Sequence, residues 1–123
     1  MDRMFAVTFN MGPTLAANHV YNFKLPFDAQ LLYASVGNST ANAGTLKIGT
    51  LADDDGYLTA FTMGVSGTPL EVKTPGAFTG ALLTGLDSGQ FPHIAAGTVI
   101  SVTITDHASH CANVCAVLLF TEG

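Results

Sequence analysis

Residues 98–106 read Thr-Val-Ile-Ser-Val-Thr-Ile-Thr-Asp, and this stretch decides the fold class. Ile100, Val102 and Ile104 fall on one face of an extended chain, and the hydroxyl residues between them fall on the other. This period-two alternation is typical of a half-buried β-strand. Phe5 and Phe9 alternate with polar or small residues in the same way near the N-terminus. The chain is therefore expected to build its core from strands.

Frequent glycines and prolines separate short runs rich in Val, Ile, Phe, Tyr and Thr, which suit a pleated surface. These runs predict strands at Met4–Phe9, His19–Phe23, Gln30–Val36, Thr45–Leu51, Tyr57–Val65, Leu70–Lys73, Phe91–Ile94, Thr98–Asp106 and Val114–Thr121. The segment Pro75–Leu86 has apolar residues four apart, but Gly80 and Gly85 interrupt it. We expect a loop there with at most one helical turn, because glycine disfavours helix by up to about 1 kcal/mol.

About eight short strands with almost no helix indicate an all-β protein, an antiparallel sandwich or barrel. We expect a jelly-roll-like sandwich. An immunoglobulin-like sandwich is the alternative, although the chain lacks Trp and has no Cys–Trp–Cys signature. Residues 1–15 are interpreted as an N-terminal strand or arm, and residues 16–123 as a single β-sandwich domain.

Composition narrows the class of protein. The 123 residues are 48% hydrophobic, which fits one ordered domain, but only 11% are charged, against about 25% in typical soluble proteins. A surface this poor in charge is expected to lie against other protein. The net charge of −5, with four Lys and Arg residues, argues against nucleic acid and anionic membranes as partners. No apolar run approaches the ~20 residues of a membrane span, and the N-terminus does not resemble a secretory signal.

The last strand is apolar on two sides. Val114, Ala116, Leu118 and Phe120 share one face, whereas Cys115, Val117 and Leu119 share the other. Both faces are therefore expected to be covered. A loop or another sheet folded over the second face would explain this pattern, and so would a subunit interface. We predict contacts between protomers at Val117 and Leu119, or at the apolar segment that contains Phe78, Leu82 and Leu83.

Two clusters could bind a metal ion. Asp53-Asp54-Asp55-Gly56 lacks the alternating acidic positions of a calcium loop, so we interpret it as a hairpin turn in which Asp-Gly supplies positive φ; Asp53 and Asp55 remain weak cation candidates. His107, His110, Cys111 and Cys115 could form a zinc site, but their spacing does not match known zinc motifs. We interpret them as a polar loop followed by a small buried cysteine. A Cys111–Cys115 disulfide requires that the segment is not extended.

The sequence shows no catalytic arrangement and no phosphate-binding glycine loop, so we predict no cofactor and no enzymatic activity. Tyr21, Tyr33 and Tyr57 could form a sugar-binding platform, but the absence of Trp weakens this interpretation, and we favour core or interface packing. Two cysteines do not make a disulfide framework and fit a protein folded in a reducing cytoplasm.

The order of the segments resembles a known group of proteins. The relevant stretches are His19–Asp28, Ala29–Asn38, Thr45–Gly49 with the Asp-rich turn after it, His93–Asp106 and Leu118–Gly123. Over about Tyr21 to Gly123, the chain resembles the small all-β capsid decoration (cement) proteins of tailed bacteriophages. The resemblance lies in the pattern and not in a diagnostic motif.

The resemblance implies a structural protein on the outer surface of a phage head, made in the host cytoplasm. Its partners would be the major capsid protein and other copies of itself, as a trimer or another small homo-oligomer. No catalytic residue is transferred. The N-terminal segment would contact the capsid, and we name Met4, Phe5, Met11 and Leu15 for this contact. The alternative function is a phage fibre or spike head, or another glycan-binding β-sandwich module.

Overall fold

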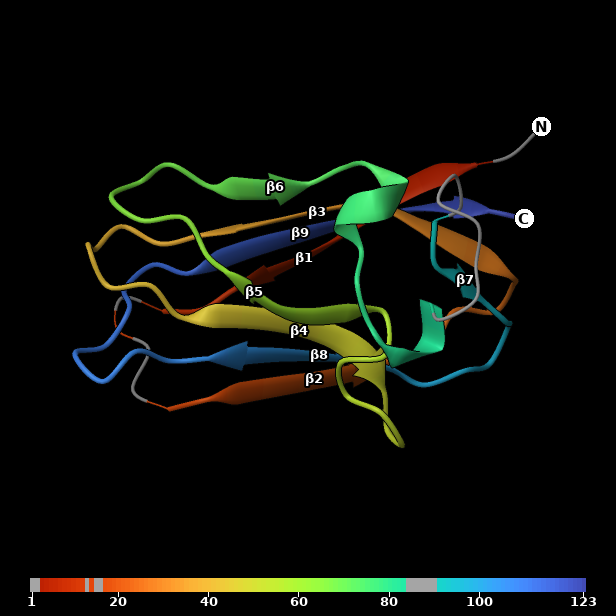
Figure 1. Cartoon of the computed structure of the whole chain (residues 1–123), viewed down its shortest axis with the longest axis horizontal. Coiled ribbons are helices and arrows are strands. Elements are labelled where there is room, and N and C mark those ends of the chain that lie inside the picture. Colours follow the sequence, from red (N-terminus) through yellow and green to blue (C-terminus); the bar gives the residue numbers. More distant parts are fainter. Residues whose placement is uncertain (1–2, 13, 15–16, 84–90) are drawn as a thin grey trace.

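The computed structural model describes residues 3–12, 14, 17–83 and 91–123, which form two antiparallel sheets (Figure 1). Sheet A contains β1 (Met4–Asn10), β3 (Ala29–Gly37), β6 (Leu70–Val72), β7 (His93–Ile94) and β9 (Cys115–Glu122). Sheet B contains β2 (His19–Phe23), β4 (Thr45–Thr50), β5 (Leu58–Thr62) and β8 (Ile100–Thr105). Two 3-10 helices, η1 (Pro75–Ala77) and η2 (Ala81–Leu83), follow β6. In this part of the chain, no helix is long and apolar enough to span a bilayer.

The strand order is that of a jelly roll. Sheet A runs β1-β9-β3-β6, with β7 also paired to β3, and sheet B runs β2-β8-β4-β5. The pairs β1·β9, β2·β8, β3·β6 and β4·β5 are nested, as if one long hairpin had been rolled into two layers. The predicted all-β jelly-roll sandwich is therefore confirmed, and the immunoglobulin-like order does not apply.

Each predicted strand overlaps an observed strand. The largest difference is at β5, which ends at Thr62 and not at Val65. The chain leaves sheet B there, because the Gly64 N–H donates to the Val36 carbonyl in sheet A (2.9 Å) and Gly64 bridges Gly37. The segment after β6 contains the short turns η1 and η2, while residues 84–86 of the predicted loop lie outside the described residues.

The core lies between the inner faces of the two sheets. It includes Leu31, Ala34 and Val36 of β3, Ile100, Val102 and Ile104 of β8, and Ala116, Leu118 and Phe120 of β9, all of them fully buried. The β1 residues Phe5, Val7 and Phe9 pack against this core. Residues 4–10 therefore form a strand of the sandwich, as the predicted N-terminal strand does.

Candidate functional site

The strongest candidate for a functional site is the face of sheet A that points away from the core. We call it the outer face. The strand register places on it Met4, Ala6, Thr8 and Asn10 from β1, Cys115, Val117, Leu119 and Thr121 from β9, and Gln30, Tyr33 and Ser35 from β3. A bulge between Leu31 and Tyr33 lets β3 present Tyr33 opposite Leu119. The described residues form two sheets, so no third sheet covers this face.

The outer face carries no Asp, Glu, Lys or Arg across β1, β9 and β3. Charged groups lie at its margins. Arg3 and Glu122 form an ion pair at one end (2.7 Å), and Glu71 of β6 lies opposite Ser35. Burying such a face against protein would strip few charges of water, and interface cores are typically depleted of charged residues.

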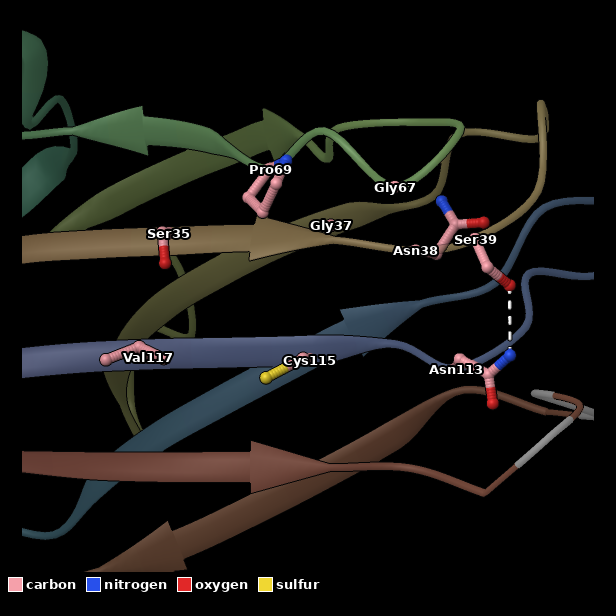
Figure 2. A pocket seen from close by; sticks show the side chains of 9 residues that line it. All are labelled: Ser35, Gly37, Asn38, Ser39, Gly67, Pro69, Asn113, Cys115 and Val117. Atoms are coloured by element: carbon pink, nitrogen blue, oxygen red, sulfur yellow. Dashed lines mark hydrogen bonds between the residues drawn. The ribbon is translucent and has the colours of Figure 1, made fainter.

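One end of the outer face is hollowed into a groove of about 280 Å³. Figure 2 shows Cys115 and Val117 of β9 beside Ser35 of β3, with Pro69 above them. The Asn113 amide donates to the Ser39 hydroxyl across the end of the groove (3.0 Å). Buried Asn38 fixes this rim, because its amide nitrogen donates to the carbonyls of Asn42 and Gly64 (both 3.0 Å). The groove thus offers hydroxyl, amide and thiol groups without a net charge.

The residues predicted for contacts between protomers separate into two groups. Val117 and Leu119 are half-buried on the outer face, where both remain available to a partner. Phe78 was wrongly assigned, because it is 4% exposed and packs in the chain's own core against Phe91. Leu82 is 46% exposed but belongs to η2, where its N–H donates to the Gly56 carbonyl (2.9 Å). The Leu83 side chain lies outside the described part.

The residues predicted for capsid contact also differ in their exposure. Met4 is 60% exposed and lies on the outer face. Phe5 points inward and packs on Phe27 and Phe120 at centroid distances of 5.4 and 5.5 Å. Met11 is 8% exposed and belongs to the core. The alternation of β1 turns Phe5 inward, so it packs against the core, and Met11 is buried just beyond the end of β1. Neither side chain is therefore free on the surface for the predicted capsid contact, and Leu15 lies outside the described residues.

The His/Cys segment forms an ordered loop around Asp106. One Asp106 oxygen accepts the backbone N–H groups of His107 and Cys111 (both 2.9 Å), and the other lies 2.6 Å from His110 Nδ1. Cys111 is buried with its thiol 3.4 Å from the Asn42 carbonyl, whereas Cys115 is exposed on the outer face. Both cysteines are free thiols. Among the described residues, no His or Cys belongs to a cluster of three potential metal ligands.

Replacing Asp106 with Asn is expected to weaken this loop in a pH-dependent way. Burial of the carboxyl opposes ionisation, but hydrogen bonds from His110 and from the Cys111 and His107 N–H groups outweigh it, so the pKa of Asp106 lies below 3.8. A carboxyl whose pKa is lowered by folding stabilises the protein above its unfolded pKa, and this contribution is lost as the pH falls through the folded pKa. Urea unfolding at neutral pH and below pH 3.8 should therefore show a smaller acid-induced loss in Asp106→Asn than in the wild type. An equal loss in both would contradict this role.

The Asp53–Asp55 segment lies in the β4–β5 connection, as predicted for a hairpin. Its three carboxylates lie within 4.8 Å of one another, and Lys47 Nζ is 3.0 Å from Asp54. A hydrogen bond with Asp55 raises the pKa of Asp53. Gly56 does not have the positive φ that we expected from the Asp-Gly pair. It is buried beneath Leu82, where a Cβ would meet the Leu82 side chain.

The three tyrosines do not form a common platform. Tyr33 lies on the outer face, Tyr21 packs against Phe9 at a centroid distance of 4.8 Å, and Tyr57 is buried. Burial also raises the pKa of Tyr57. A sugar-binding surface built from these residues is therefore not present.

No protein-family model matches the chain, and no curated protein matches it. Among solved structures, a chain of the cyanophage Pam1 capsid asymmetric unit is similar, with 17% sequence identity and a TM-score of 0.49. The match covers 100% of this chain and 84% of that chain. Similarity at this level does not assign a function to this chain.

Proposed function

We propose that the chain is a non-enzymatic structural protein of a bacteriophage virion. It decorates the outer surface of the capsid and stabilises it by binding neighbouring major capsid subunits as a homo-oligomer. The observation that carries the proposal is the uncharged outer face, in which Met4, Val117 and Leu119 lie together. The resemblance of the segment order to capsid decoration proteins supports the same function.

Short side chains make the outer face suitable for a flat protein contact. Ala6, Thr8, Ser35 and Cys115 lose little side-chain entropy when a partner covers them, whereas ordering a Lys or Glu costs up to about 2 kcal/mol. Their hydroxyl and thiol groups can still form hydrogen bonds across the contact. Such a surface can bind a repeating lattice firmly without a central charged residue.

The proposed mechanism is differential binding. A protein that binds the expanded capsid lattice better than its free subunits shifts the equilibrium toward the lattice by that difference in affinity. No chemical step is needed.

Replacing Leu119 with Asp should weaken capsid binding strongly while the fold persists. The variant places a charge at the centre of the outer face, and burying an unpaired carboxylate is costly. We expect the affinity for expanded heads of the parent phage to fall at least about tenfold, which corresponds to about 1.4 kcal/mol. Cosedimentation with expanded heads and with precursor shells measures the effect, and the wild type should prefer the expanded heads.

Thr103→Asp is the matched control, because Thr103 is half-buried on the outward side of the central strand β8 in sheet B. It should leave head binding unchanged. Circular dichroism and thermal unfolding identify any variant that fails to fold. Wild-type protein that does not bind heads, or equal binding by a folded Leu119→Asp variant, would contradict the proposed contact.

A further inference from the structure

Strand β1 forms one edge of sheet A, and no strand of the described residues pairs with its other side. Figure 1 shows β1 beside β9 at the end of the sheet. Its seven residues pair with β9 without a register shift. Met4, Ala6, Thr8 and Asn10 are all exposed. An open edge of this kind is a template for another strand.

The hydrogen bonds show which backbone groups are free for such pairing. The Arg3 carbonyl accepts the Glu122 N–H (2.8 Å), and the Met11 N–H donates to the Val114 carbonyl (3.0 Å). In an antiparallel ladder, the residues that bond to one neighbour alternate with those that point the other way. The odd-numbered residues of β1 thus bond to β9. The N–H and C=O groups of Met4, Ala6, Thr8 and Asn10 point outward from the edge.

The other edges are less suited to pairing. β6 has three residues and includes Glu71, while β5 has a register shift in its pairing with β4. β2 has five residues, against seven in β1. Short strands, charges and bulges are the features that natural proteins use to block edge pairing. β1 has no charge, no proline and no bulge.

The sequence of β1 is also symmetric about its centre. Phe5 and Phe9 lie two residues on either side of Val7, all facing the core side, and Ala6 and Thr8 flank Val7 on the outer face. In an antiparallel pair of two β1 strands centred on Val7, Phe5 would lie opposite Phe9, and Ala6 opposite Thr8. Only even-numbered residues would then form hydrogen-bonded pairs between the two β1 strands. These are the residues whose N–H and C=O groups point away from β9.

We propose that two copies of the chain pair through β1, antiparallel and with the two-fold axis at Val7. The proposal rests on the homo-oligomer of the proposed function and names its interface. Cross-strand neighbours point to the same side of a sheet, so the two outer faces would form one continuous surface. Such a dimer would bind two capsid positions at once and gain avidity. An isologous contact closes as a dimer, which differs from the trimer implied by the resemblance.

A disulfide at the two-fold axis tests this geometry. The two Val7 residues would form a non-hydrogen-bonded pair with Cα atoms about 4.5 Å apart, within the range that a disulfide spans. Val7→Cys in a Cys115→Ser background should give a covalent dimer under mild oxidation. Ala6→Cys in the same background is the matched control, because each Ala6 would lie opposite Thr8 and diagonal to its own copy. Equal crosslinking of both variants, or none of Val7→Cys, would overturn the proposal.

Light scattering supplies the second measurement. The wild type should have the mass of a dimer. Thr8→Pro should have the mass of a monomer and retain its circular dichroism spectrum, because the Thr8 N–H points away from β9 and proline is tolerated at such edge positions. A wild-type monomer or trimer would overturn the edge pairing. Both measurements use the protein without capsids, so failure to bind heads would contradict the proposed function and leave the dimer standing.

Discussion

Replacing Phe120 with Ala should lower the free energy of unfolding by about 3–5 kcal/mol, the usual range for a large aromatic residue removed from a packed core. Phe120 is fully buried in the central strand β9. Its ring stacks on Phe5 at 5.5 Å and meets Phe23 edge-on at 6.2 Å, so it joins β1 to β2 across the two sheets. Since a domain is stable by only about 5–15 kcal/mol, this loss is large. Urea unfolding measures it.

The adjacent residue on the same strand provides the control. Leu119 points to the outer face and is half-buried, so Leu119→Ala should cost roughly 1 kcal/mol, in the range of ordinary substitutions. The same substitution should weaken capsid binding, whereas residual folded Phe120→Ala should bind normally. Equal destabilisation by both variants would mean that the outer side of β9 is packed within the chain, and would contradict its assignment to a partner.

The alternation of residues predicted most of the strands because each lies at the surface of a single core. β9 shows how far this reasoning extends. The sequence indicated two apolar faces, and the structure assigns Phe120 to the core and Leu119 to the outer face. The sequence alone could not tell whether the second face is covered within the chain or by a partner, because both cases require apolar residues with the same period.

Apolar residues outside the regular alternation were harder to place. Phe78 follows η1 in a loop, and neither its neighbours nor its spacing indicates that it folds back against Phe91 in the core. Met11 follows the end of β1 and is buried, and its N–H donates to the carbonyl of Val114, which directly precedes β9. Burial at such positions depends on contacts that are distant in sequence.

The order of the strands in the sheets could not be predicted from local sequence patterns either. The sequence of β1 shows its symmetry about Val7, but only the pairing of β1 with β9 shows that the strand is an edge and which backbone groups are free. The role of Asp106 has the same origin. Its carboxylate organises the following loop through His107, His110 and Cys111, and no residue pattern distinguishes it from a solvated aspartate.

Replacing Gly49 with Val should destabilise the protein by about 3 kcal/mol, at the upper end of the range for overpacking. Gly49 lies in β4, and the Asp-rich turn folds directly over it. A Cβ at this position would meet the Asp53 carbonyl oxygen, and it would lie 2.6 Å from backbone atoms of Asp54 and Gly56. The Asp53 carbonyl accepts the N–H groups of Thr50 (2.8 Å) and Gly56 (3.1 Å), so the turn cannot move aside without losing these bonds.

Glycine inside a strand often marks such a close backbone approach. Substitution of a second glycine that has no close neighbours tests whether the loss at Gly49 comes from this approach or from the replacement of glycine in general. A Cβ added at Gly76 would meet no atom within 4 Å, and the φ angle of Gly76 is not positive. Gly76→Ala should therefore be neutral or stabilising by up to about 1 kcal/mol, because alanine restricts the unfolded chain. If thermal and urea unfolding showed equal losses for both variants, the effect at Gly49 could not come from the turn. A loss confined to Gly49→Val would show that the Asp53–Gly56 connection is held against β4 by backbone contact, whether or not a cation binds its carboxylates.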